Sequence, residues 1–167
     1  PGIIYDADLF DESALYFRKD GSIGANAAAV SAGDSSAGPD GKRGTSDDGL
    51  PDTWNDFLTL LERLRMNYTP FTWAESPSTY QISRVFDAIW ANYEGYDNFM
   101  LNYSFKGTDG NLGSINENNF TKLLNQEGRK AAIKAFYDIT KNQENYSAKA
   151  RPGGGNTHTG AQREYIQ

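Results

Sequence analysis

The sequence has no cysteine and only one histidine, His158, among its 167 residues. Disulfide bonds and thiolate metal sites are therefore excluded, and one imidazole is too few for a zinc or iron site rich in histidine. No run of about 18 apolar residues occurs, so there is no signal for a transmembrane helix. Residues 1–5 have neither a charged n-region nor a cleavage site, and we expect any targeting signal to lie outside this chain.

Basic side chains are also scarce. The chain has 16 Lys and Arg against 22 Asp and Glu, which gives a formal net charge of −6. Proteins that grip nucleic acids nonspecifically neutralise phosphates with clustered Lys and Arg, so we expect no nucleic-acid partner. The charge is uneven, because residues 1–62 hold twelve acidic against four basic side chains. A bound cation would be expected in this acidic part.

Large aromatic side chains are abundant. Hydrophobic residues make up only 38% of the chain, but ten Tyr, nine Phe and three Trp bring the aromatic share to 13%. These side chains bury large apolar areas, so the composition is sufficient for a folded core. The length fits one ordinary domain and is too short for two of typical size.

Three stretches have the apolar periodicity of helices. The first is predicted to begin with a capping box, in which Thr53 and Asp56 satisfy each other's backbone N–H groups, and to end near Asn67. The second follows residues 76–78 and stops near Gly95. The apolar stripes comprise Trp54, Phe57, Leu58, Leu61 and Leu64 in the first, Ile82, Val85, Phe86, Ile89, Trp90 and Tyr93 in the second, and Ala131, Ala132, Ile133, Ala135, Phe136 and Ile139 in the third.

Short strands are predicted where β-branched and aromatic residues cluster. These segments are residues 2–5, which we expect to be buried, 68–73 and about 101–105. Residues 21–51, rich in Gly, Ala, Ser and Asp, predict a long loop or insertion, and a further helix is expected to begin at Ala161. Strands that alternate with helices indicate an α/β fold.

The acidic, Gly-rich part of residues 21–51 has the composition of a calcium site. Calcium binds about six to eight oxygen atoms, and Asp residues spaced among Gly turns bring carboxylates and backbone carbonyls together. The pattern is not that of an EF-hand, which needs Asp-x-Asp-x-Asp-Gly and a terminal Glu. The alternative is a solvated acidic turn whose carboxylates cap local backbone groups. The candidate metal-site residues are Asp34, Asp40, Lys42, Asp47 and Asp48.

A second group of candidate residues lies between the predicted strand at 68–73 and the helix that follows it. Sugars bind by stacking their C–H faces on aromatic rings and by hydrogen bonding to carboxylates, amides and the backbone donors of a helix N-terminus. Trp73, Glu75, Ser76 and Tyr80 supply this chemistry. The alternative is that Trp73 belongs to the core and Tyr80 packs on its own helix.

The sequence offers little for catalysis. It contains no Gly-x-Ser-x-Gly, His-Glu-x-x-His or P-loop pattern, and no Ser has a convincing base, because His158 lies in a Gly-rich segment. A glycosidase needs two carboxylates on either side of the scissile bond, and the spacing identifies no such partner for Glu75. We therefore expect that the protein is not an enzyme.

Several segments resemble one known family. They are residues 2–10 (GIIYDADLF), 38–57 (GPDGKRGTSDDGLPDTWNDF), 68–73 (YTPFTW) and 92–103 (NYEGYDNFMLNY). These segments resemble the family 1 extracellular solute-binding proteins of carbohydrate ABC importers, which are similar in fold to maltose-binding protein. Residues 51–57 match the usual Pro-x-Thr-Trp-x-Glu-Phe helix start of that family, with Asp in place of Glu. The Gly-rich segment 151–160 departs from it.

The resemblance implies a fold and a set of partners. The fold would be a partial second lobe of a periplasmic-binding-protein-like type II fold spanning residues 1–167, a short, mostly parallel sheet flanked by helices, with the acidic insertion at 21–51. The protein would capture an oligosaccharide outside the cell, closing on it together with a first lobe and presenting it to ABC permease subunits. The resemblance further implies a lipoprotein anchor in the full-length protein, and places Trp73, Glu75 and Tyr80 near the ligand.

Two other functions remain open at this point. One is a calcium-dependent carbohydrate-binding or adhesion module of a bacterial surface protein, for which a β-sandwich would be expected, although the three helical stripes favour a different fold. The other is a fragment of a glycoside hydrolase, which would need a second aligned carboxylate.

Overall fold

The computed structural model describes residues 3–74, 79–107 and 112–166. The chain divides into two compact units, one formed by Ile3–Pro70 and the other by Phe71–Gln167 with Pro1–Gly2. The inclusion of both units in one lobe stays a prediction. Across the described residues, no helix is both long and apolar enough to cross a membrane.

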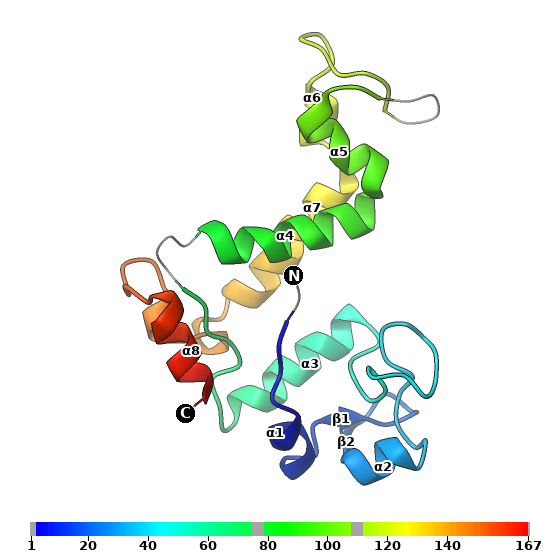
Figure 1. The fold of residues 1–167 in the computed structure, drawn as a ribbon, viewed down its shortest axis with the longest axis vertical. Coiled ribbons are helices and arrows are strands. Elements are labelled where there is room, and N and C mark those ends of the chain that lie inside the picture. Colours follow the sequence, from blue (N-terminus) through cyan, green and yellow to red (C-terminus); the bar gives the residue numbers. More distant parts are fainter. Residues whose placement is uncertain (1–2, 75–78, 108–111, 167) are drawn as a thin grey trace. The chain divides into compact units, whose positions relative to one another are not determined.

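The unit Ile3–Pro70 combines helices with a small sheet (Figure 1). Its elements are α1 (Ala7–Glu12), β1 (Tyr16–Phe17), β2 (Ile23–Ala25), α2 (Ala27–Ser31) and α3 (Trp54–Arg65). The carboxylate of Asp6 caps α1 by accepting the N–H of Leu9 at 3.0 Å. The core of this unit comprises Phe10, Leu15, Tyr16, Phe17, Ala25, Leu60 and Leu64.

The sheet corrects the prediction of a mostly parallel sheet. Strands β1 and β2 pair in antiparallel register, with Tyr16 opposite Ala25. They are joined by a tight turn in which the N–H of Arg18 donates to the carbonyl of Ser22 at 2.8 Å, and Gly21 adopts a φ of 78°. A connection this short can join only antiparallel strands, because parallel strands need a long crossover. The mixed α/β class is confirmed.

Two other predicted strands, at residues 2–5 and 68–73, are wrong. Residues 3–6 form no regular structure, and Ile4, which was expected to be buried, is 80% exposed. Residues 68–73 make only an isolated parallel bridge, between Phe71 and Tyr146. A β-branched or aromatic run becomes a strand only beside a partner strand, and the residues on either side of Tyr146 form 3-10 turns, at Gln143–Asn145 and Ala148–Ala150.

The helix predicted from Thr53 is confirmed as α3. The backbone N–H of Thr53 donates to Asp56 Oδ2 at 3.0 Å, and the N–H of Asp56 donates to Thr53 Oγ1 at 3.1 Å, which completes the capping box. Leu61 and Leu64 are buried as the periodicity predicts, whereas Trp54 at the first position is 37% exposed.

The described part of the second unit is largely helical. Its elements are α4 (Thr79–Glu94), α5 (Tyr96–Ser104), α6 (Thr121–Leu124), α7 (Glu127–Thr140), the 3-10 turns η1 (Gln143–Asn145) and η2 (Ala148–Ala150), and α8 (His158–Ile166). Helices α4 and α7 lie side by side, and α5 packs on α4 (Figure 1). The predicted helices are confirmed as α4 and α7, and α8 begins three residues before Ala161.

Helix α5 replaces the strand predicted near 101–105. The aromatic residues that suggested a strand pack at helical spacing, since Phe99 contacts Tyr103 one turn later with ring centroids 5.6 Å apart. Leu101 is fully buried with Ile115 and Leu123 in a small core. Gly95, at a φ of 84°, forms the turn between α4 and α5.

Candidate functional site

The acidic loop folds around the carboxylate of Asp47. Asp47 Oδ1 accepts from the hydroxyl of Thr45 at 2.6 Å, and Oδ2 accepts from the backbone N–H of Asp40 at 3.0 Å. These two bonds lower the pKa of Asp47 below its ordinary value, with the Thr45 hydroxyl as the larger cause. Gly38 closes the loop, because a Cβ at this position would lie 2.1 Å from the carbonyl oxygen of Asp47.

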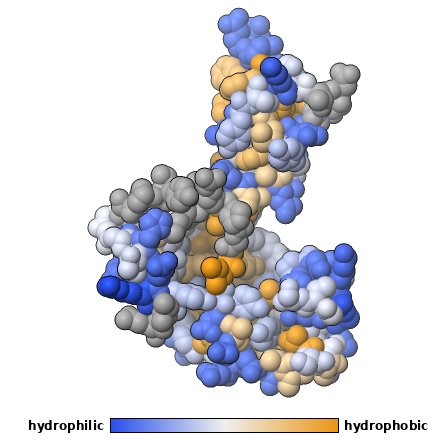
Figure 2. Space-filling view, in the orientation of Figure 1, coloured by the Kyte–Doolittle hydropathy of each residue, from blue (hydrophilic) through white to orange (hydrophobic). Residues whose placement is uncertain are grey.

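The neighbouring carboxylates also accept from the loop's own backbone. Asp40 Oδ1 accepts from the N–H of Lys42 at 2.7 Å, and Asp48 Oδ2 accepts from the N–H of Gly44 at 2.8 Å. Lys42 takes part in this network through its backbone, with its N–H donating to Asp40 and its carbonyl oxygen 3.0 Å from the hydroxyl of Thr45. In the orientation of Figure 1 the loop lies at the right-hand edge of the first unit, and Figure 2 shows mainly hydrophilic residues there.

The fifth candidate metal-site residue, Asp34, pairs with Lys19 at 3.3 Å, and both side chains are more than half exposed. Among the residues that the structure describes, no three Asp, Glu or His side chains are grouped in a way that would hold a metal ion. The observed hydrogen bonds are those expected for a solvated acidic turn. Calcium binding by this loop stays a prediction.

The predicted sugar site is described only in part. Trp73 is partly exposed, and its ring stacks on Tyr146 with centroids 4.8 Å apart and an interplanar angle of 24°. Glu75 and Ser76 lie outside the described residues. Tyr80 belongs to α4, as predicted for the helix after the loop, but its side chain is not among those described. The structure therefore places one of the four predicted residues in detail.

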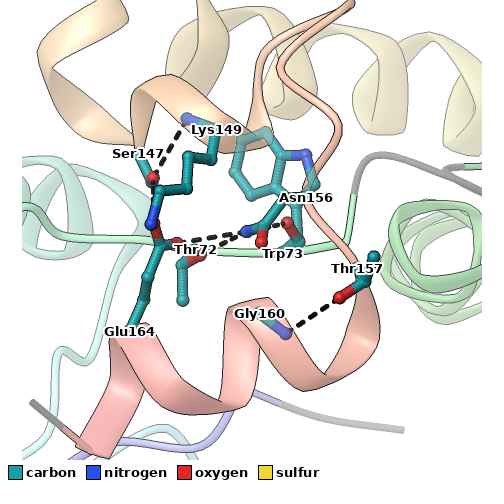
Figure 3. Close-up of polar contacts among 8 residues, drawn as sticks. All are labelled: Thr72, Trp73, Ser147, Lys149, Asn156, Thr157, Gly160 and Glu164. Atoms are coloured by element: carbon teal, nitrogen blue, oxygen red, sulfur yellow. Dashed lines mark hydrogen bonds and ion pairs between the residues drawn. The ribbon is translucent and has the colours of Figure 1, made fainter.

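A polar cluster, consisting of Thr72, Ser147, Lys149, Asn156 and Glu164, lies beside the backbone of Trp73 (Figure 3). Asn156 is only 3% exposed, and its Nδ2 lies 3.0 Å from the carbonyl oxygen of Trp73, 3.2 Å from Thr72 Oγ1 and 3.1 Å from Glu164 Oε2. One amide group thus joins the segment that carries the indole ring to helix α8.

Glu164 is the main acceptor in this cluster. Its Oε2 also accepts from the hydroxyl of Thr72, and its Oε1 accepts from the hydroxyl of Ser147 at 3.0 Å and pairs with the ammonium of Lys149 at 3.3 Å. Burial alone would raise the pKa of Glu164, but the donors from Thr72, Ser147 and Lys149 outweigh it, and the pKa lies below its ordinary value. Glu164 is therefore ionised near neutral pH.

Local sequence explains how α8 presents Glu164. Thr157 caps the helix, since its Oγ1 accepts the N–H of Gly160 at 3.0 Å. Gly160 leaves room for Asn156, because a Cβ at Gly160 would lie 2.3 Å from Asn156 Oδ1. The Gly-rich segment that departs from the family pattern therefore ends in a specific cap and a close contact.

Sequence reasoning missed Asn156 and Glu164 as neighbours of Trp73. The local signal available was the cap, since Asn156 and Thr157 are polar residues placed just before a helix. That signal predicts a helix start and gives no information on the segment 83 residues earlier to which Asn156 bonds.

The sequence matches no protein-family model, no curated protein and no solved structure.

Proposed function

We propose that this protein captures an oligosaccharide as part of the substrate-binding component of a carbohydrate ABC importer, and that it carries out no reaction of its own. In this proposal a first lobe completes the sugar site, permease subunits receive the sugar, and the full-length protein is held outside the cell as a lipoprotein. The observation that carries the proposal is the partly exposed Trp73 ring, held on Tyr146 beside a hydrogen-bonded cluster.

The chemistry of this region supports sugar binding. An indole ring offers a flat apolar face to the C–H groups of a pyranose, and stacking on Tyr146 limits the orientations open to the ring. Glu164, the described carboxylate beside Trp73, accepts from four donors, so its lone pairs are committed within the protein. These bonds support a structural role for Glu164, in which it holds the site together, and not the role of a general base.

The resemblance of residues 68–73 to the solute-binding family supports a sugar site next to Trp73, because in those proteins the loop after this segment faces the sugar.

For the alternative, a calcium-dependent carbohydrate-binding module, a β-sandwich was expected. The described residues contain one two-stranded sheet, so no observation favours that alternative.

The three tryptophans provide a direct test. In a 15N-labelled chain each indole N–H gives one NMR signal, assigned by replacing Trp54, Trp73 and Trp90 with Phe in turn. Neutral trisaccharides such as maltotriose, cellotriose and xylotriose are added to millimolar concentrations. We expect one of them to shift the Trp73 signal. The signals of Trp54, exposed in the other unit, and Trp90, buried, are expected to stay in place. Equal shifts of all three signals, or none at Trp73, would contradict the proposal.

A further inference from the structure

We infer that Asn156 and Glu164 are positioning residues for the indole ring of Trp73, an inference that rests on the proposed sugar site. A positioning residue is one that sets the orientation of a ligand-binding group without touching the ligand. The inference is carried by hydrogen bonds that converge on the two backbone segments bearing the stacked rings, those of Trp73 and Tyr146.

The amide of Asn156 has one workable orientation. Its Nδ2 faces three acceptors, which are the Trp73 carbonyl, Thr72 Oγ1 and Glu164 Oε2. Its Oδ1 faces Gly160, where no side chain intervenes. Turning the amide over would place oxygen against the carbonyl and the carboxylate, and a buried acceptor left without a donor costs free energy. The buried Asn156 therefore fixes the carbonyl of Trp73 in place.

The carboxylate of Glu164 accepts the hydrogen bonds that the amide of Asn156 and the neighbouring side chains donate. Both of its oxygens accept, with Thr72 and Asn156 on Oε2 and Ser147 and Lys149 on Oε1. Glutamine has the same shape, but its NH2 group would replace one of these two oxygens. It would then face the two donors that the oxygen accepts from, either Thr72 and Asn156 or Ser147 and Lys149. An ionised carboxylate has an acceptor oxygen for each of these two pairs of donors.

These bonds reach both rings of the stacked pair. Thr72 precedes Trp73 and Ser147 follows Tyr146, and both hydroxyls donate to Glu164. The backbones of the same two segments are joined, since the N–H of Phe71 donates to the carbonyl of Asn145 at 3.0 Å. Glu164 therefore restrains the ring of Trp73 through Thr72 and the ring of Tyr146 through Ser147. Rings held in place before binding lose less conformational entropy when a ligand stacks on them.

A swap of the two polar groups separates positioning from simple stabilisation. In the single variant Asn156→Asp, the new carboxylate faces Glu164 and the Trp73 carbonyl. In the double variant Asn156→Asp with Glu164→Gln, the introduced amide donates to the introduced carboxylate and its oxygen accepts from Ser147 and Lys149, so contact with α8 is restored. The carbonyl of Trp73 still lacks its donor, because an ionised carboxylate cannot donate.

The variants are compared by thermal unfolding, by the Trp73 indole NMR signal, and by affinity for the trisaccharide that shifts that signal in the unaltered chain. We expect Asn156→Asp to lower the melting temperature, and to weaken sugar binding about fivefold because the Trp73 side chain would then have to be ordered on binding. We expect the double variant to regain at least half of the lost melting temperature while sugar binding stays weakened. Glu144→Gln, at an exposed carboxylate of the same unit, serves as the control and should match the unaltered chain.

The inference is overturned if sugar affinity returns together with the melting temperature in the double variant, because the cluster would then act only through stability. It is also overturned if the Trp73 signal of the sugar-free double variant coincides with that of the unaltered chain. This second measurement needs no sugar, so it decides on positioning even where no trisaccharide shifts Trp73 and the proposed function has failed.

Discussion

The carboxylate of Glu94, the last residue of α4, accepts the backbone N–H of Gly128 in the first turn of α7 at 2.7 Å. Helix α7 has no side-chain cap at its own N-cap residue, Gln126. A side chain from a neighbouring helix therefore supplies one missing acceptor, and its negative charge lies near the positive end of the α7 dipole.

Replacing Glu94 with Ala should destabilise the protein. We expect the free energy of unfolding, measured by urea denaturation, to fall by about 1 kcal/mol through loss of the cap and of the charge at the helix end. Glu117→Ala, at an exposed residue of the same unit, is the matched control and should change the free energy by less than about 0.5 kcal/mol. Equal effects of the two substitutions would contradict the capping role.

Gly128 should tolerate no side chain. A Cβ at this position would lie 2.6 Å from the carbonyl oxygen of Trp90 and 2.6 Å from Glu94 Cβ, where α4 and α7 pack. We expect Gly128→Ala to cost about 1–3 kcal/mol, because the two helices would have to move apart. A neutral or stabilising result in the same urea measurement would show that the helices approach less closely than described.

Glu164 should make the stability of the protein depend on pH. The folded state lowers its pKa below the ordinary value of 4.5, so its contribution is present above that pH and is lost as the pH falls through the folded value. We expect the difference in unfolding free energy between the unaltered chain and Glu164→Gln to be largest near pH 7 and to shrink below pH 4.5. A difference that does not change with pH would contradict the lowered pKa.

The acidic loop can be tested with calcium. A ligand that binds only the folded state raises the melting temperature, so millimolar calcium should stabilise the chain if the loop binds it, and magnesium serves as the control cation. Replacing Asp47 with Asn should abolish such a rise. No rise with calcium in the unaltered chain would remove calcium from the account and leave the loop as an acidic turn.

The predictions that succeeded depend on contacts between residues close in sequence. Thr53 and Asp56 are three residues apart and form the predicted capping box. Helices α4 and α7 were found from apolar residues at helical spacing, although two members of the predicted stripes, Tyr93 and Ile133, are 68% and 54% exposed.

The predictions that failed depend on partners far away in the chain. Ile3 and Ile4 have strand-forming side chains, but their position in a sheet would be set by another strand, and no local pattern predicts one. The polar cluster was missed for the same reason, since Asn156 and Glu164 reach Thr72 across 84 and 92 residues. Hydrogen bonding in the acidic loop is local, yet composition alone did not distinguish backbone caps from metal ligands.

Affinity should be low in this chain by itself. A sugar held between two lobes loses much of its buried surface when one lobe is missing, so we expect binding weaker than roughly micromolar in calorimetry. Micromolar or tighter binding of an oligosaccharide to residues 1–167 would contradict the need for a companion lobe.

The most direct test of the account is to compare Trp73→Ala with Trp54→Ala in NMR titrations with the trisaccharide that the unaltered chain binds. The account predicts that Trp73→Ala weakens binding about tenfold, through loss of the stacking face, and that Trp54→Ala leaves it unchanged. Binding that survives Trp73→Ala, or that falls equally in both variants, would contradict the claim that Trp73 is the sugar-stacking residue.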